Sequence, residues 1–316
     1  MKGLTVALIL AGTITLTIGG VCFGIGLYNK AQNENVIENS YDITDAFENI
    51  DIDLETADLY FKESLDNKVR VDCNDRTKYY QDVTVDSGVL KIKTIDHRKW
   101  YEKYIFAFNF KRFDVTVYLP TATYGTLRVK TATGDVDFEK CASFTKATIK
   151  TNTGNIAFTN NVSESLEVTS DTGNIKLKEL SAKSIKAKTS TGNINIEEAE
   201  VEEEVNTYSS TGSHKFNKVN CDTLIAKSST GGARLIETVA ATSFDINTST
   251  GGVRFESCDA GTIKVKTSTG DIKGSLKTNK IFDAHSGTGS VKVPLSGEGG
   301  ICKLESSTGS INITIE

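Results

Sequence analysis

Residues 185–196 read IKAKTSTGNINI, and this stretch decides the fold. On both sides of Thr191 and Gly192, apolar residues alternate with polar ones. A period of two is typical of a β-strand with one buried face, because successive side chains point to opposite sides. The parity changes across Gly192, so the sequence predicts two short strands joined by a bend at the glycine.

The same unit recurs along the chain. Thr-Gly pairs occur ten times at intervals of 19 or 20 residues, with the glycines at Gly134, Gly154, Gly173, Gly192, Gly212, Gly231, Gly251, Gly270, Gly289 and Gly309. One unit cannot bury its own apolar face, but units stacked in parallel about 4.8 Å apart form a continuous core. We therefore predict an all-β fold: a single-stranded parallel β-solenoid (β-helix) of about ten 19–20-residue coils.

The N-terminal region differs in character. Residues Leu4 to Tyr28 form an uncharged segment, and this segment is long enough to cross a bilayer core of about 30 Å. No small-residue cleavage site follows, so we expect an uncleaved anchor. Lys2 before the span favours a cytoplasmic amino terminus, which makes this a single-pass cell-membrane protein with an extracytoplasmic C-terminal domain. The predicted organisation is a transmembrane anchor at 1–28, a juxtamembrane linker at 29–40, a β-rich N-terminal cap at 41–120 and the β-solenoid repeat domain at 121–316.

The repeats and the segments before them resemble those of a known family. The repeated Ser-Thr-Gly-Asn-Ile and Ser-Thr-Gly-Asp-Ile phrases resemble the bacterial "putative adhesin" or toast-rack β-strand-repeat domains, a family of unknown function. The lead-in segments ADLYF (57–61), VLKIK (89–93) and VTVYLP (115–120) resemble that family's entry strands. The resemblance covers residues 45–316. It implies a membrane-anchored envelope protein and carries no catalytic residues.

Composition and motifs give little sign of catalysis. The net charge of −5 excludes a globally basic nucleic-acid binder, and three histidines are too few for most multi-histidine metal sites. No nucleophile elbow, P-loop or zinc motif is present, and the even coil length leaves no long loops for clustered acids. We predict that the protein is not an enzyme and has no catalytic, cofactor or metal site; a carbohydrate-active enzyme is the least favoured alternative. His214 falls on an inward position, where a core histidine is favoured over a catalytic one.

Other side chains recur at fixed positions. Hydroxyl residues stand three and one positions before each glycine, with the parity of the inward apolar residues, so we expect buried ladders that hydrogen-bond coil to coil. Asn or Asp follows the glycine in five coils and favours a tight turn, with a calcium site as the alternative. The cysteines lie too far apart to pair within the solenoid, so we expect small buried residues at Cys73, Cys141, Cys221, Cys258 and Cys302.

One regular pattern of surface charge is present, a basic strip. Three positions after the glycine, five coils in sequence order carry a cation, at Lys215, Arg234, Arg254, Lys273 and Lys292. The simplest interpretation is a solvated face whose charges are offset by neighbouring acids. The alternative is a docking strip for a polyanion.

The function expected from these features is non-enzymatic. We expect a membrane-anchored extracytoplasmic β-solenoid that acts as a cell-envelope scaffold, adhesion or stress-response accessory module. The alternative is a binding module for anionic cell-wall polymer or a membrane surface. The expected partners are the membrane, through the anchor, and anionic cell-wall polymer or envelope proteins, with no nucleic acid and no cofactor.

Overall fold

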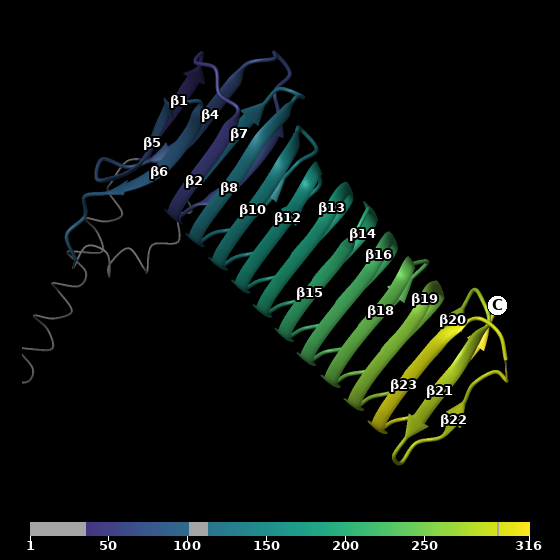
Figure 1. Cartoon of the computed structure of the whole chain (residues 1–316). Helices are drawn as coiled ribbons and strands as arrows, with labels where there is room; N and C mark the ends of the chain where they lie inside the picture. Colours follow the sequence, from purple (N-terminus) through teal and green to yellow (C-terminus); the bar gives the residue numbers. More distant parts are fainter. Residues whose placement is uncertain (1–35, 101–112, 296) are drawn as a thin grey trace, which may run out of the picture.

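The computed structural model describes residues 36–100, 113–295 and 297–316, and every element within them is a β-strand. These strands form one 24-stranded sheet wound into an elongated stack (Figure 1). The predicted anchor at 1–28 and most of the linker at 29–40 lie outside the described residues. Within the described residues, no helix is long and apolar enough to cross a membrane.

The predicted parallel β-solenoid is confirmed. Each strand pairs in parallel with the equivalent strand of the neighbouring coil; Ile185, for example, lies opposite Leu166 on one side and Val205 on the other. The strands of the main stack are β8 (Thr123–Thr133), β9 (Val136–Phe138), β10 (Ser143–Thr153), β11 (Ile156–Phe158), β12 (Asn161–Thr172), β13 (Ile175–Thr191), β14 (Ile194–Val201), β15 (Glu204–Thr211), β16 (His214–Thr230), β17 (Ala233–Ile236), β18 (Val239–Thr250), β19 (Val253–Thr269) and β20 (Ile272–Leu276).

The alternating apolar residues form one core along the axis of the stack. Ile194 and Ile196, on the far side of the Gly192 bend, are both fully buried. Phenylalanines stack from coil to coil, with ring centroids 4.1 Å apart for Phe61 and Phe138. Burial of an aliphatic or aromatic side chain of this size contributes about 1.5–3 kcal/mol, so many adjacent coils together stabilise a unit that none could form alone.

The five coils from Gly173 to Gly251 turn at two bends of different chemistry. At the Thr-Gly bend, Gly192 has φ +150°, and a Cβ there would lie 2.0 Å from the carbonyl oxygen of Gly173 in the coil below. Only glycine allows this close backbone approach. Six residues after the glycine, a second bend places non-glycine residues in the left-handed region, as at Glu198 with φ 53°.

The parallel stack extends into the segment predicted as a cap. β2 (Asn49–Thr56) and β3 (Asp58–Glu63) pair in parallel with β8 and β9, so they form a coil without a Thr-Gly pair. Ala57 takes the glycine's place, since a Cβ on Gly134 would lie 1.9 Å from its carbonyl oxygen. β6 (Val89–Asp96) and β7 (Asp114–Leu119) add a further parallel layer on β2 and β3.

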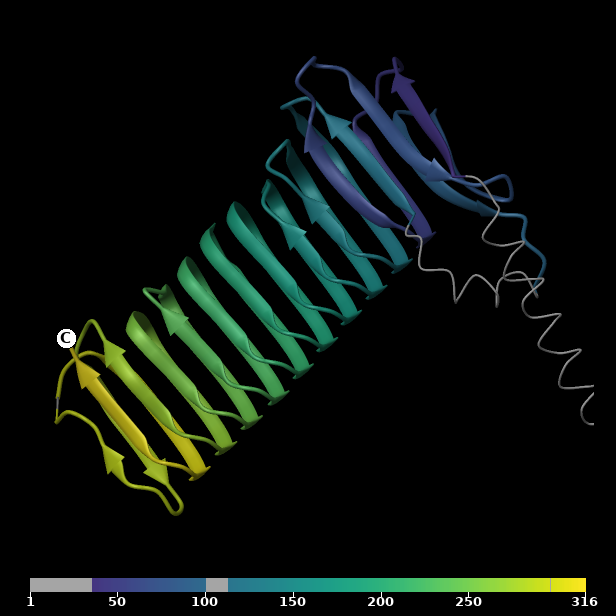
Figure 2. The same cartoon turned by 180° about the vertical axis from the view of Figure 1, so that it is seen from behind.

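Antiparallel strands close this end of the solenoid. β5 (Tyr79–Asp86) pairs with β6, β4 (Val69–Asp75) pairs with β7, and β1 (Ile37–Ile43) pairs with β4, all antiparallel. Figure 2 shows them at the end of the stack opposite the carboxyl terminus. A terminal coil would otherwise expose a row of unpaired backbone groups, so the antiparallel strands protect the edge.

The last two coils are stacked out of sequence order. β23 (Gly300–Thr308) pairs with β19 on one side and with β21 (Lys280–Ser286) on the other. β24 (Ile311–Ile315) likewise lies between β20 and β22 (Val291–Lys292). The coil containing Gly289 is therefore the outermost layer, and the later coil is inserted beneath it (Figure 1). Val291, on a predicted inward position, is 43% exposed because no coil covers that layer.

Candidate functional site

The basic strip is a true column for most of its length. Lys215 lies opposite Arg234, Arg234 opposite Arg254, and Arg254 opposite Lys273, in register from coil to coil. All four side chains are substantially exposed. Adjacent members are about 4.8 Å apart along the stack, because that is the spacing of hydrogen-bonded strands.

The prediction that the strip runs through five successive coils is wrong at Lys292. Asn312 of β24 lies opposite both Lys273 and Lys292, so it separates these two cations. The physical reason is the insertion of the final coil, which sequence order alone does not reveal. The contiguous column is therefore Lys215, Arg234, Arg254 and Lys273, with Lys292 beyond a neutral position.

Acidic side chains pair with every member of the contiguous column. Lys215 contacts Glu197 at 3.1 Å, and Lys273 contacts Asp271 at 2.8 Å. Both arginines share a single carboxylate, that of Glu256, each at 2.8 Å. The hydrogen bond from Arg234 lowers the pKa of Glu256, so this carboxylate remains ionised.

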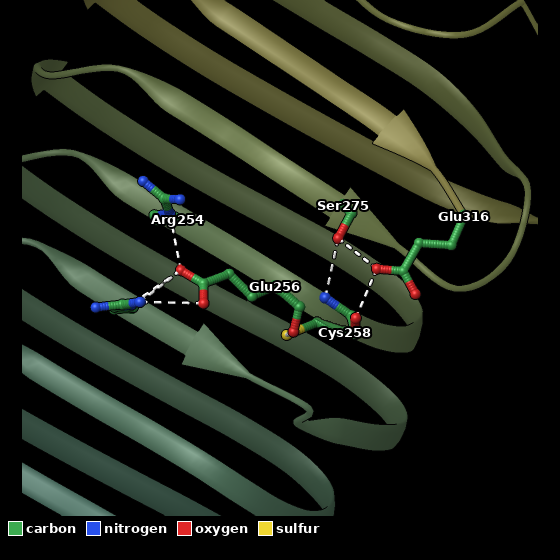
Figure 3. Close-up of polar contacts among 7 residues, drawn as sticks. Arg254, Glu256, Cys258, Ser275 and Glu316 are labelled. Atoms are coloured by element: carbon green, nitrogen blue, oxygen red, sulfur yellow. Dashed lines mark hydrogen bonds and ion pairs between the residues drawn. The ribbon is translucent and has the colours of Figure 1, made fainter.

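Glu256 also lies beside a second polar cluster (Figure 3). The Glu316 carboxylate accepts hydrogen bonds from the hydroxyls of Ser257 and Ser275, each at 2.6 Å. The Ser257 backbone N–H donates to the Ser275 hydroxyl at 3.0 Å. These bonds tie neighbouring coils together on one side of the paired arginines.

The residues that follow each Thr-Gly pair form a ladder of side-chain-to-backbone hydrogen bonds. The Asn155 side-chain oxygen accepts from the Asn174 backbone N–H at 2.9 Å, and Asn174 accepts in the same way from Asn193 at 2.9 Å. In the same way, the Asp135 side chain accepts from the Asn155 backbone N–H, and the Asn193 side chain accepts from the Ser213 backbone N–H. Their role is therefore to join coils, which accounts for the recurring Asn and Asp without a calcium ion.

The ladder is interrupted in the middle of the basic column. Gly232 and Gly252 occupy two consecutive ladder positions and have no side chain to accept a hydrogen bond. A surface groove of about 380 Å³ lies there, lined by residues that include His214, Arg234, Arg254, Asp271 and Lys273. The groove was not among the predicted features, although the Gly-Gly pairs at 231–232 and 251–252 are a sequence signal for it.

Half of the predicted hydroxyl ladder is buried and half is not. Residues three before the glycine are buried in all these coils except at Ser286, which is partly buried. Several bond to a neighbouring coil, as the Ser170 hydroxyl donates to the Gly154 carbonyl oxygen at 2.9 Å, whereas the Thr131 hydroxyl has no partner among the described residues. Residues one before the glycine, such as Thr172, are exposed, so that part of the prediction is wrong. The chain has already begun to turn at that position, and strict alternation ends there.

His214 and the cysteines are core residues. His214 is 1% exposed, and neither ring nitrogen has a hydrogen-bond partner among the described residues. Desolvation by burial lowers its pKa to about 4, so the ring is neutral at pH 7. Burial raises the pKa of the Cys141 thiol to about 12, which makes it a poor nucleophile. All five described cysteines are buried and unpaired, as predicted.

The comparisons with known proteins agree on one fold. A family model described as "Toastrack DUF4097" matches residues 47–210 and 202–316. A crystal structure of a "putative adhesin" from Parabacteroides distasonis is 15% identical, covers 77% of this chain and 98% of its own, and has a TM-score of 0.51. Another from Parabacteroides merdae is 14% identical, covers 78% and 98%, and also has a TM-score of 0.51. A search of curated proteins finds no match. At these identities the structures show the fold alone.

Proposed function

Because the chain belongs to the Toastrack DUF4097 family, we propose that it is a membrane-anchored, extracytoplasmic protein of the cell envelope. Its β-solenoid acts without catalysis, as a scaffold, adhesion or stress-response accessory module. Neighbouring structures described as "putative adhesin" support a surface role by analogy of fold.

One observation carries this proposal: from β8 to β20 the coils form a continuous hydrogen-bonded stack with short connections. Such a solenoid is a rigid rod that offers long repeated surfaces, and each coil adds a fixed length. The described residues contain no group of three or more His, Cys, Asp or Glu side chains placed to hold a metal ion. The grooves beside Arg234 and beside Arg70 are shallow and open, which suits contact with extended partners.

The test of location uses intact cells. An epitope placed after Glu316 should be removed by added protease without lysis, because the whole solenoid lies outside the membrane. Protection of the epitope until the cells are lysed contradicts the proposed orientation.

The test of a scaffold role uses the length of the rod. Deletion of residues 155–192 joins Gly154 to Asn193 in the same phase of the repeat and should leave a shorter, folded stack. A spacer or scaffold function should decline with this deletion. A function that persists unchanged depends instead on a local surface, and the basic column remains present to supply it.

A second candidate function is the binding of an anionic cell-wall polymer or membrane surface. The observation that favours it is the in-register column Lys215, Arg234, Arg254 and Lys273. Exposed charges attract weakly one at a time, so affinity would come from several contacts together. The double variant Arg234→Glu, Arg254→Glu should weaken binding with little change in melting temperature. Absence of wild-type binding at about 50 mM salt, where the Debye length still exceeds about 10 Å, refutes this candidate.

A further inference from the structure

The interruption of the ladder leaves two backbone donors without acceptors. In the earlier coils, each ladder N–H donates to the side-chain oxygen of the coil before it, as Asn193 donates to Asn174 at 2.9 Å. Gly232 and Gly252 have no such oxygen. Within the described residues, the N–H groups of Gly252 and Asp271 therefore have no hydrogen-bond partner.

These two donors lie in the groove that the arginines border. Gly252 and Asp271 line it together with Arg234 and Arg254, and adjacent coils place the two N–H groups about 4.8 Å apart. His214 lines the same groove, is 1% exposed, and has two ring nitrogens without hydrogen-bond partners in the described structure. Unpaired backbone N–H groups in a concavity beside cationic side chains are the elements of an anion site.

We propose that this groove is an oxyanion subsite that takes one phosphate group of an envelope polyanion. The phosphate oxygens replace the two missing ladder oxygens and accept from the Gly252 and Asp271 N–H groups, while Arg234 and Arg254 balance the charge. The proposal deepens the second candidate function and rests on it: the column gives general attraction, and the subsite fixes one group of the polymer.

Two carboxylates lie near the proposed phosphate position and affect its binding. Glu256 holds both arginines, so a bound phosphate competes with it for the guanidinium groups. The Asp271 carboxylate is occupied, because it contacts Lys273 at 2.8 Å and accepts from the Ser310 N–H at 2.9 Å. Removing the charge of Glu256 should therefore strengthen phosphate binding.

The first experiment restores the ladder. In Gly252→Asn, the new side-chain oxygen occupies the place of one phosphate oxygen and accepts from the Asp271 N–H. Gly252→Ala is the matched control, because it adds the same Cβ, 2.9 Å from the Asp271 carbonyl oxygen, without an acceptor. The probe is inorganic phosphate, titrated into the full chain in neutral detergent and followed through the amide resonances of Gly252 and Asp271.

The expected result is a saturable shift of both resonances in the wild type and in Gly252→Ala. Gly252→Asn should bind phosphate at least about tenfold more weakly than Gly252→Ala, and Glu256→Gln should bind more tightly than the wild type. The proposal is overturned if phosphate shifts neither resonance in the wild type, or if Gly252→Asn and Gly252→Ala bind equally well.

A second experiment separates the subsite from the column and identifies the source of the phosphate. Polyphosphate serves as the polymer probe, and vesicles of anionic phospholipid serve as the membrane probe. Weaker polyphosphate binding in Gly252→Asn supports the proposal. If Arg234→Glu abolishes polyphosphate binding and Gly252→Asn leaves it unchanged, the column functions and the subsite is refuted. Binding to vesicles without binding to polyphosphate overturns the assignment to a polymer.

Discussion

His214 should make the stability of the solenoid depend on pH. The ring is buried between Ile194 and Ala233 of the adjacent coils, and desolvation lowers its pKa from 6.5 to about 4. Below pH 6.5, His214 binds a proton in the unfolded chain, whereas in the folded chain it stays neutral until the pH falls to about 4. The contribution of His214 to stability is therefore fully present above pH 6.5 and is lost as the pH falls towards 4.

The magnitude follows from the two pKa values. Between pH 7.5 and pH 4.5, the linkage relation gives a loss of about 2–3 kcal/mol in the free energy of unfolding from this residue alone. His214→Ile places an apolar side chain like that of Ile194 at the site and should remove this loss. The carboxylates titrate in both proteins, so the difference between wild type and variant isolates the histidine.

The assay is urea unfolding of the wild type and His214→Ile at pH 7.5, 6.0 and 4.5. The variant should gain stability relative to the wild type as the pH falls. His285→Gln, at an exposed position, is the control and should follow the wild type at every pH. If the difference between wild type and His214→Ile is the same at pH 7.5 and 4.5, the reasoning about a buried neutral ring is refuted.

Three further changes test the packing of the coils. Phe255→Ala, in the core, should lower the free energy of unfolding by about 3–5 kcal/mol, whereas exposed Asn247→Ala should change it little; equal urea midpoints would show that the inward and outward assignment is wrong. Asn174→Ala removes one ladder acceptor and should cost about 1 kcal/mol, and an unchanged denaturation curve would rule out that role. Gly192→Ala should lower the melting temperature far more than Gly88→Ala, because a Cβ at the first site meets backbone and at the second meets nothing within 4 Å; similar melting temperatures would argue against close coil stacking.

Local sequence determined the architecture of the coil. The alternation around Gly192 fixes which side chains point inward, because a strand presents successive residues to opposite faces. The glycine is required where a Cβ would meet the backbone of the coil below. Both are properties of a few adjacent residues, and the regular interval repeats them, so parallel stacking and a continuous core could be read from the chain alone.

Only part of the candidate site could be predicted from the sequence. Lys215, Arg234, Arg254 and Lys273 share one phase of the repeat, and the structure places them in one column. Their partner Glu256 serves two arginines at once, which depends on the approach of side chains from different coils. Spacing gives the register of a column, but it does not give the hydrogen-bond partners of its members.

The tertiary structure alone decided the order of the coils at both ends. Ala57 occupies a glycine position although no Thr-Gly pair marks its coil, because alanine's carbonyl can stack beneath Gly134. The final coil enters between the coils of Gly270 and Gly289, and thereby separates Lys273 from Lys292. Every coil presents nearly the same edge to its neighbour, so the repeat specifies that coils stack and not which coil lies next. That choice is made by long-range packing, which buries Cys302 and Leu304 of β23 and Ile311 and Ile313 of β24 and leaves the exposed strand β22 outermost.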